Sequence, residues 1–240
     1  MRLRRIGVVL LVVSTLLAVA PAQATTPKAD VRKSVSYAKR WLKSLKNVTL
    51  TDIAYKRTQD FGKAWVDVDA DGCKTRDQIL IRDLTSEVVA SGCQVRSGIL
   101  KDPYTGRTIK FTRGVSTSLA VQIDHVIPLH LAWQLGAYNW SFGKRVAFAN
   151  DPVNLIATDG PTNGAKSDSG PDEWLPPRSS YRCTYVIRFI RVAFLYKVGI
   201  TSTMRSAMTQ VLNQCKTVVG NPLSWIPLPV SVHNYAAQIG

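Results

Sequence analysis

The sequence predicts an α+β fold, and three observations support this prediction. Short β-prone runs occupy residues 87–111. Two more short apolar runs lie at 120–127 and 153–158, each next to polar residues. Elsewhere, apolar residues recur at helical spacing around 35–45 and again over 181–217. Short β-branched runs favour strands and a 3.6-residue period favours helices, so both kinds of element are expected.

The first residues have the organisation of a secretory signal peptide. Residues 1–5 are basic, 6–19 are apolar, and Ala22-Gln23-Ala24 has the small-x-small form of a cleavage site. The pattern predicts a signal peptide over residues 1–24, cut after Ala24. Its apolar run is shorter than the roughly 20 residues of a spanning helix, so a membrane anchor is the less favoured alternative. We expect an extracellular, monomeric mature chain, residues 25–240, that folds as a single domain without a further membrane span.

The amino-terminal half is expected to hold one helix and a small β region. Apolar residues between 35 and 45 are separated by lysine and arginine, which predicts an amphipathic basic helix. Residues 64–68 and 87–111 are β-prone, with a turn at 103–106. The apolar positions of the helix are Val35, Ala38, Trp41, Leu42 and Leu45.

The carboxyl-terminal half is expected to combine two strands with several helices. The strands cover 120–127 and 153–158, and Asp159 or Thr162 can cap a short helix after the second one. The segment 129–149 is expected to be helical, with breaks near Gly136 and Gly143. A helical pair follows at 181–198 and 202–217, within residues 181–217.

The chain is strongly basic, with 31 lysines and arginines against 16 carboxylates and a formal net charge of +15. The signal peptide holds three arginines and no acid, so the mature chain keeps an excess of +12. This charge attracts polyanions, namely nucleic acid, anionic cell-wall polymer or a membrane surface, and charge alone does not choose among them. Basic stretches around 32–46, 107–113 and 182–197 are the expected phosphate contacts.

Four cysteines, an even number in an exported chain, indicate two disulfides. Three pairings are open, and proximity in the sequence favours Cys73–Cys93 and Cys183–Cys215. A zinc site is the alternative, although the chain has no Cys-x-x-Cys pair and only three histidines.

An ordered polar series lies around the two strands of the carboxyl-terminal half. Asp124 and His125 are adjacent, Asn154 and Asn163 are nine residues apart, and Lys166 follows three residues later. A hydrolytic metal site needs oxygen ligands, a base for water and a cation for developing charge. This series supplies all three.

The series resembles the HNH, or ββα-metal, endonuclease family, and its spacing is similar to HNH domains of RNA-guided DNA-cutting effectors. The flanking runs resemble secreted actinobacterial HNH proteins, which are related to the C-terminal domain of a modified-DNA restriction enzyme. The wider match covers about residues 50–220, with a ββα-metal core at about 120–178. The runs are Trp65 with Gly72-Cys73-Lys74-Thr75-Arg76, Asp102-Pro103-Tyr104-Thr105-Gly106, Phe148-Ala149-Asn150-Asp151-Pro152 and Trp174-Leu175-Pro176-Pro177.

The resemblance implies a role for each residue of the series. Asp124 and Asn163 would ligate one divalent cation, with Mg²⁺ expected and Mn²⁺ or Ca²⁺ as alternatives. His125 would be the general base, and Asn154 would hold the His125 loop across the hairpin. Lys166 would face the substrate phosphate and neutralise transition-state charge. The family's third histidine is absent here, since Asn163 stands at that position, and this leaves the metal preference open.

Three further groups of residues lie outside this series. Asp67, Asp69 and Asp71 resemble the start of a calcium loop, but Gln78 stands where such loops need a bidentate glutamate, so an aspartate-rich turn is favoured. Arg76 and Arg113 are candidate substrate contacts or partners in structural ion pairs. His130 is expected to be structural. His130 lies five residues after His125, so the two histidines would not share one face of a helix as a zinc pair would.

The expected function is therefore a secreted endonuclease that hydrolyses nucleic-acid phosphodiesters, DNA above all and RNA as an alternative, with little sequence preference. Two other functions stay open. One is a polyanion- or cell-wall-binding protein with an inactive nuclease core. The other is a metal phosphodiesterase that acts on another polymeric substrate.

Overall fold

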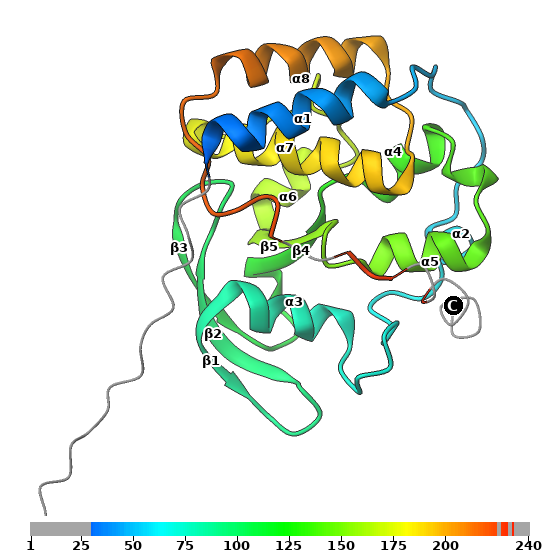
Figure 1. The fold of residues 1–240 in the computed structure, drawn as a ribbon. Helices are drawn as coiled ribbons and strands as arrows, with labels where there is room; N and C mark the ends of the chain where they lie inside the picture. Colours follow the sequence, from blue (N-terminus) through cyan, green and yellow to red (C-terminus); the bar gives the residue numbers. More distant parts are fainter. Residues whose placement is uncertain (1–29, 225–226, 230–231, 233–240) are drawn as a thin grey trace, which may run out of the picture.

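The computed structural model describes residues 30–224, 227–229 and 232, so the expected signal peptide and its cleavage site lie outside the described residues. The α+β prediction is confirmed, because helices and two small antiparallel sheets share the fold (Figure 1). The elements are α1 Val31–Ser44, α2 Arg57–Phe61, α3 Thr75–Asp83, β1 Leu84–Val89, β2 Val95–Lys101, β3 Thr108–Thr112, η1 Thr117–Ala120, β4 Val121–His125, α4 Leu129–Gln134, η2 Ala137–Asn139, α5 Phe142–Asn150, β5 Leu155–Asp159, α6 Gly160–Lys166, α7 Ser179–Tyr196 and α8 Ser202–Gln214.

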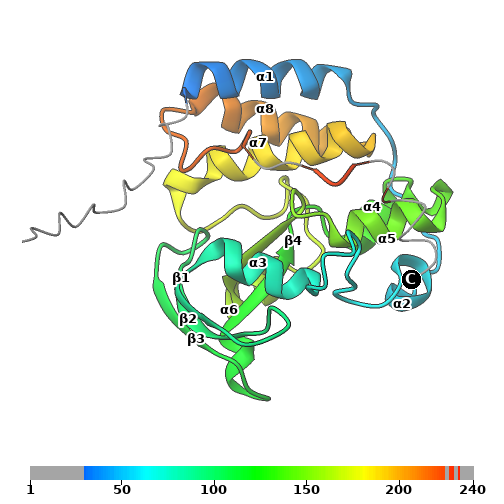
Figure 2. The same cartoon turned by 60° about the horizontal axis from the view of Figure 1, so that its bottom comes forward.

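The elements form three regions (Figures 1 and 2). The helices α1, α7 and α8 make a layer at one end, and the β1-β2-β3 sheet with α3 lies at the other. The β4–β5 hairpin lies between them and leads directly into α6. Within the described residues, no helix combines the length and apolar character needed to cross a membrane.

The hairpin is buried on both faces. In β5, Leu155 and Ala157 point to a small core beneath α3, whereas Ile156 points to the larger core beneath α7. Successive residues of a strand face opposite sides, so each sheet face meets its own core. The antiparallel register places Asp124 opposite Ile156 and His125 opposite Leu155. The end of β4 is therefore held between two packed regions.

One expectation about local structure was wrong. Residues 64–68 form turns instead of a strand, because Trp65 has a left-handed backbone (φ 59°) and the Asp67 carboxylate accepts the amides of Asp71 and Gly72. The expected break near Gly143 is confirmed, because the backbone is extended at Trp140 and Ser141 and α5 begins only at Phe142. The break at Gly136 is confirmed, and its φ of 113° explains why glycine stands there.

Both favoured disulfides are confirmed. Cys73–Cys93 joins the start of α3 to the β1–β2 connection, and Cys183–Cys215 joins the first turn of α7 to the end of α8. Each bond closes a loop within one region of the fold.

Two arginines from different regions brace the connection that precedes β5. Arg82 of α3 donates to the carbonyls of Pro152 (2.8 Å) and Leu155 (2.7 Å). Arg188, fully buried in α7, donates to Val153 (2.9 Å) and Leu155 (2.5 Å). Since buried carbonyls need donors, these guanidiniums fix the path of the chain into the second strand of the hairpin.

This brace predicts that Arg188→Met lowers the free energy of unfolding by about 1–3 kcal/mol, because it leaves the Val153 carbonyl without its donor and the Leu155 carbonyl with Arg82 alone. Urea unfolding without reductant measures the change. Arg191→Met, on the same helix but only half-buried, is the matched control and should cost clearly less. Equal losses in the two variants would show that the brace carries no special stabilisation.

Candidate active site

A polar cleft of about 360 Å³ lies where β4 ends. Its walls come from three stretches that are distant in the sequence. They are the end of β4 with the start of α4, the helix α6 with the residues just after it, and the start of α2 with the segment before it. The lining residues are Tyr55, Arg57, Ile123, Asp124, His125, Pro128, Leu129, His130, Asn163, Gly164, Ser167 and Asp168. Three residues of the predicted series, Asp124, His125 and Asn163, thus share one cleft.

Asp124 is held at both carboxylate oxygens. The Tyr104 hydroxyl donates to Oδ2 at 2.6 Å, and the Lys166 ammonium donates to Oδ1 at 2.8 Å. The side chain is only 6% exposed, so these charged and polar partners take the place of water around it. Each oxygen still keeps a lone pair for a further ligand.

Lys166 does not lie where the resemblance placed it. Its side chain is fully buried, and its ammonium donates to Asp124 and to the His125 carbonyl (2.9 Å). The helix α6 packs against β4, which directs the end of this side chain inward. A buried ammonium needs acceptors and a negative partner. The His125 carbonyl and the Asp124 carboxylate supply them. Lys166 therefore contacts Asp124 instead of facing an open phosphate site.

His125 is oriented by one hydrogen bond and one ring contact. Its Nε2 lies 2.8 Å from the Ala149 carbonyl, and its ring stacks on Trp65 with 5.9 Å between centroids. A carbonyl only accepts, so Nε2 carries the proton and Nδ1 keeps a basic lone pair. Burial lowers the pKa of His125 to about 3; the bond to Ala149 opposes this shift, and the nearby cations Arg57 and Lys166 contribute to it. The ring is neutral at ordinary pH.

Asn154 is buried at the start of β5 and bonds the backbone after His125. Its Oδ1 accepts from the Ile127 amide (2.9 Å), and its Nδ2 donates to the Ile127 carbonyl (3.3 Å). Its own carbonyl accepts from Val126 at 2.7 Å. Three bonds thus join the two sides of the hairpin just beyond His125 and limit where that ring can lie.

Asn163 stands in the middle of α6 and faces the cleft. Its Nδ2 donates to Gln122 Oε1 at 2.9 Å, which leaves Oδ1 without a hydrogen-bond partner among the described residues. Asp124 and Asn163 thereby offer a carboxylate oxygen and a neutral amide oxygen to the same cleft. Mg²⁺-like cations take few protein oxygens and fill the other positions with water and phosphate, so this donor set fits such an ion.

The Asp102–Gly106 run explains how Tyr104 reaches Asp124. The Asp102 carboxylate accepts from Thr105 within its turn and from Thr158 (2.7 Å) and the Asp159 amide (3.1 Å) of β5. This clamp fixes the turn to the hairpin and directs the Tyr104 hydroxyl inward. The Asp102–Gly106 run is visible in the sequence, but its spacing does not indicate that Tyr104 bonds Asp124.

Several cleft residues were missed by sequence reasoning. Tyr55 lies just before α2 and Arg57 is the first residue of that helix, far upstream in the chain, and no motif marks them. His130, expected to be structural, lines the cleft: its Nδ1 lies 3.2 Å from Asp168, and its ring stacks on Tyr55 at 4.8 Å. The contact between His130 and Asp168 joins residues that are 38 positions apart, so no local sequence pattern could indicate it.

Neither Arg76 nor Arg113 lines the cleft. Arg113 pairs with Asp77 and donates to the Val95 carbonyl at 2.6 Å, and Arg76 donates to the Val121 carbonyl at 3.3 Å. Both contacts tie α3 to the strands beside it. The structural interpretation therefore fits these two residues, since their guanidiniums are directed to protein acceptors.

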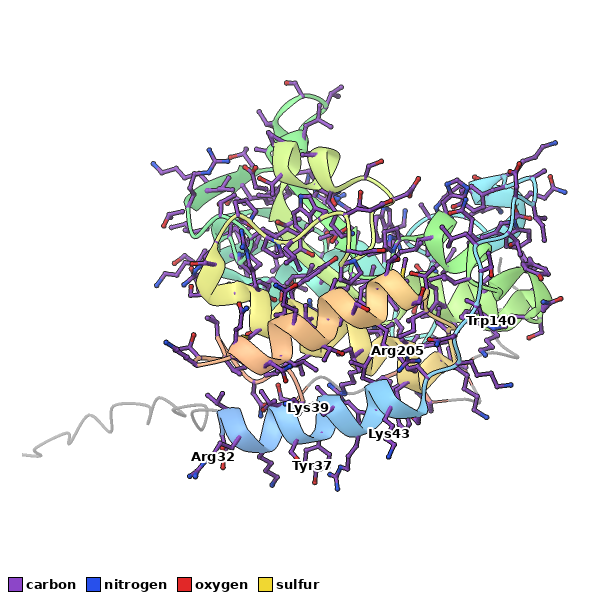
Figure 3. All side chains as sticks on the ribbon, turned by 90° about the horizontal axis from the view of Figure 1, so that it is seen from above. Arg32, Tyr37, Lys39, Lys43, Trp140 and Arg205 are labelled. Atoms are coloured by element: carbon purple, nitrogen blue, oxygen red, sulfur yellow. A yellow bond between two sulfur atoms is a disulfide. The ribbon has the colours of Figure 1, made fainter. Side chains whose placement is uncertain are left out.

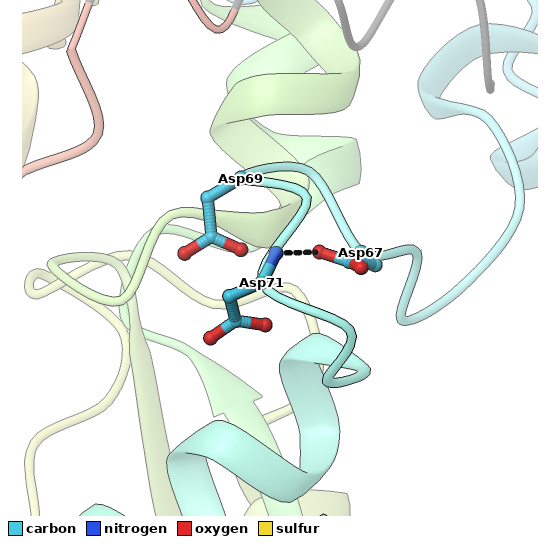
Figure 4. A group of neighbouring side chains, drawn as sticks. All are labelled: Asp67, Asp69 and Asp71. Carbon is cyan, nitrogen blue, oxygen red and sulfur yellow. Dashed lines mark hydrogen bonds between the residues drawn. The ribbon is translucent and has the colours of Figure 1, made fainter. Parts of the chain in front are cut away.

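The aspartate-rich loop does not line the cleft, and its three carboxylates are drawn in Figure 4. Asp67, Asp69 and Asp71 place one oxygen each within 4.8 Å of one another. Asp67 bonds amides of its own loop, and the Gln78 amide donates to Asp69 (3.1 Å) and Asp71 (2.8 Å). The carboxylates are thus engaged by the loop and by the residue at the twelfth position, as in an aspartate-rich turn.

Comparison with known proteins shows the family of this chain. A family model of the GmrSD restriction endonucleases, C-terminal domain, matches residues 74–210. An uncharacterized secreted protein of Arthroderma benhamiae is 42% identical over 145 residues, covering 60% of this chain and 68% of that protein. No solved structure matches. The matched range contains the hairpin, α6 and the whole polar series, and the chain belongs to the family of the C-terminal domain of GmrSD restriction endonucleases.

Proposed function

We propose that this protein is a secreted, metal-dependent endonuclease with a ββα-metal core formed by β4, β5 and α6. The observation that carries the proposal is the position of His125. Its ring is neutral, its Nε2 is bound to the Ala149 carbonyl, and it lines the same cleft as Asp124 and Asn163. Membership in a family of restriction endonuclease domains supports the same activity.

In this function, His125 Nδ1 accepts a proton from the attacking water. Ala149 and Asn154 keep the ring and its loop in place while the proton moves. Asp124 and Asn163 would hold one divalent cation, with Mg²⁺ the first candidate. When bound, that cation supplies positive charge for the phosphate and the leaving oxygen. Lys166 and Tyr104 hold the Asp124 carboxylate in its orientation.

The substrate class follows from charge and family. The mature chain is strongly basic, and restriction endonuclease domains act on nucleic acid. DNA is the proposed substrate, with RNA the alternative to test. No described element has the form of a base-reading module, so phosphate contacts should dominate and sequence preference should be small.

Export is part of the proposal. A signal peptide pattern precedes the described residues, two disulfides lie within them, and a relative is named as a secreted protein. Disulfides persist in oxidising compartments, which agrees with an extracellular enzyme. The rival function, a polyanion binder with an inactive core, does not account for a neutral histidine that lines the same cleft as two metal-ligand candidates.

The central prediction is that His125→Ala abolishes Mg²⁺-dependent nicking of plasmid DNA. Loss of a general base costs on the order of 10²–10⁴ in rate, whereas binding of DNA should persist because His125 carries no charge. Gel analysis of the mature protein with Mg²⁺ or with chelator measures the activity. His130→Ala is the matched control within the cleft. Retention of more than about a tenth of the wild-type rate by His125→Ala would refute the assigned role.

The two asparagines should behave differently. Asn163→Ala removes a proposed ligand and should raise the Mg²⁺ concentration for half-maximal activity by about tenfold or more. Asn154→Ala removes the bonds to Ile127 and should lower stability by about 1–3 kcal/mol without a comparable shift in metal requirement. Metal titration calorimetry provides a readout that does not depend on turnover. Equal metal shifts in the two variants would contradict this division of roles.

The buried position of Lys166 makes a separate prediction about stability. Lys166→Met leaves Asp124 buried without its positive partner and should lower the free energy of unfolding by about 3–5 kcal/mol. Lys110→Met removes an exposed lysine and should change stability by no more than about 0.5 kcal/mol. Urea denaturation of the two variants decides which role Lys166 has. If Lys166 were a surface phosphate contact, its replacement would leave the free energy of unfolding unchanged.

A further inference from the structure

Positive charge is concentrated in the helical layer and not around the cleft. Residues 31–51 hold six lysines and arginines and no carboxylate, and residues 174–220 hold seven and none. Residues 52–173, which include the hairpin and α6, hold 14 cations against 15 carboxylates. The first two stretches fold as α1, α7 and α8 with their connections. The cationic excess of the described chain therefore belongs to this layer.

The helix α1 carries most of the exposed part of this charge. All six of its basic residues, counting Lys46 just beyond its end, are exposed, and none forms an ion pair with another described residue. Arg32, Lys39 and Lys43 are spaced by seven and four residues, which places them on one side of the helix. Figure 3 shows these three along α1, with Arg205 of α8 close to them.

Two adjoining hollows follow the seam between α1 and α8. One, of about 540 Å³, is lined by Arg32, Lys39, Arg40 and Lys43 among others, and it contains no carboxylate. The other, of about 280 Å³, shares Lys39 and Lys43 and adds Arg205. Because the two hollows share lysines, they form one basic depression, which we call the α1–α8 seam.

The structure holds parts of this seam in place. Lys39 donates to Asn213 of α8 at 2.8 Å, and Arg205 donates to carbonyls at the end of α1, Leu42 and Leu45. The charges therefore lie on a packed surface instead of on a free helix. A prearranged set of cations loses less side-chain entropy when an anion binds.

The seam is separate from the cleft. In the view of Figure 3, α1 lies at one edge and α6 at the other, with α8 and α7 between them. The cleft itself is not strongly basic: its lining includes Arg57, together with the carboxylates of Asp124 and Asp168. Electrostatic attraction for a polyanion must therefore come largely from outside the cleft.

We propose that the α1–α8 seam is a second nucleic-acid-binding surface, which holds the phosphate backbone of a polymeric substrate while the cleft acts on another segment. This inference rests on the proposed nuclease function for the identity of the polyanion. The helix is about 20 Å long, a length of duplex that carries about a dozen phosphate charges. A row of exposed cations over this length suits a polymer and not a single phosphate group.

The test compares two triple variants with the same change in net charge. Arg32→Glu, Lys39→Glu and Lys43→Glu alter the seam. Lys63→Glu, Lys74→Glu and Lys101→Glu alter exposed lysines elsewhere and form the control. Both are made in the His125→Ala background, and urea unfolding checks that both are folded.

Fluorescence anisotropy with a 30-base-pair duplex then measures affinity over a range of salt. The seam variant should bind about tenfold or more weakly than the control, and its plot of log affinity against log salt should be shallower by about 2–3, because three phosphate contacts are lost. Equal losses in the two triple variants would overturn the inference. Tighter binding to vesicles with anionic lipid than to DNA, lost in the seam variant, would also overturn it by making the partner a membrane.

Activity provides the second readout, in proteins that retain His125. The seam variant should cleave plasmid DNA about tenfold more slowly while hydrolysing bis(p-nitrophenyl) phosphate at the unaltered rate, since the small ester cannot reach both sites. Equal loss on both substrates would refute a separate binding surface. If neither protein cleaves either substrate, the proposed nuclease function fails, and the anisotropy comparison alone still decides whether the seam binds nucleic acid.

Discussion

The buried carboxylate of Asp124 is the constraint on which the candidate site depends. A carboxylate removed from water is costly unless it is paired and hydrogen-bonded, and here each oxygen has its own donor. Lys166 comes from α6 and Tyr104 from the turn between β2 and β3, so one side chain joins three elements. Anything that moves α6 or that turn would leave this charge without a partner.

The path of the hairpin depends on a related principle. The connection before β5 exposes several carbonyls to the protein interior, and Arg82 and Arg188 reach them from opposite regions. Asn154 then bonds the residues after His125. A series of polar contacts, from α3 and α7 through the hairpin, thus sets the position of the histidine ring. The two hydrophobic cores hold the strands of the hairpin from either side.

The distribution of charge separates two tasks. The region that holds the cleft is nearly balanced in charge. Within it, burial keeps His125 neutral, and Asp124 pairs with Lys166. The helical layer carries the excess, where it can attract a polyanion without altering the surroundings of His125 and Asp124. Long-range attraction falls off over roughly 10 Å at ordinary salt, so the two regions can be tuned independently.

The sequence by itself determined the kinds of element, the positions of the hairpin strands and the polar series, because these depend on periodicity and on neighbours along the chain. It also favoured the two disulfides that form. Only the tertiary structure decided that Lys166 is buried against Asp124, that Tyr104 completes that pair, and that Arg76 and Arg113 bond protein acceptors. The same holds for Arg57 and His130 in the cleft. These contacts join residues far apart in the chain, and their partners depend on how α3, α6 and α7 pack, which no local pattern specifies.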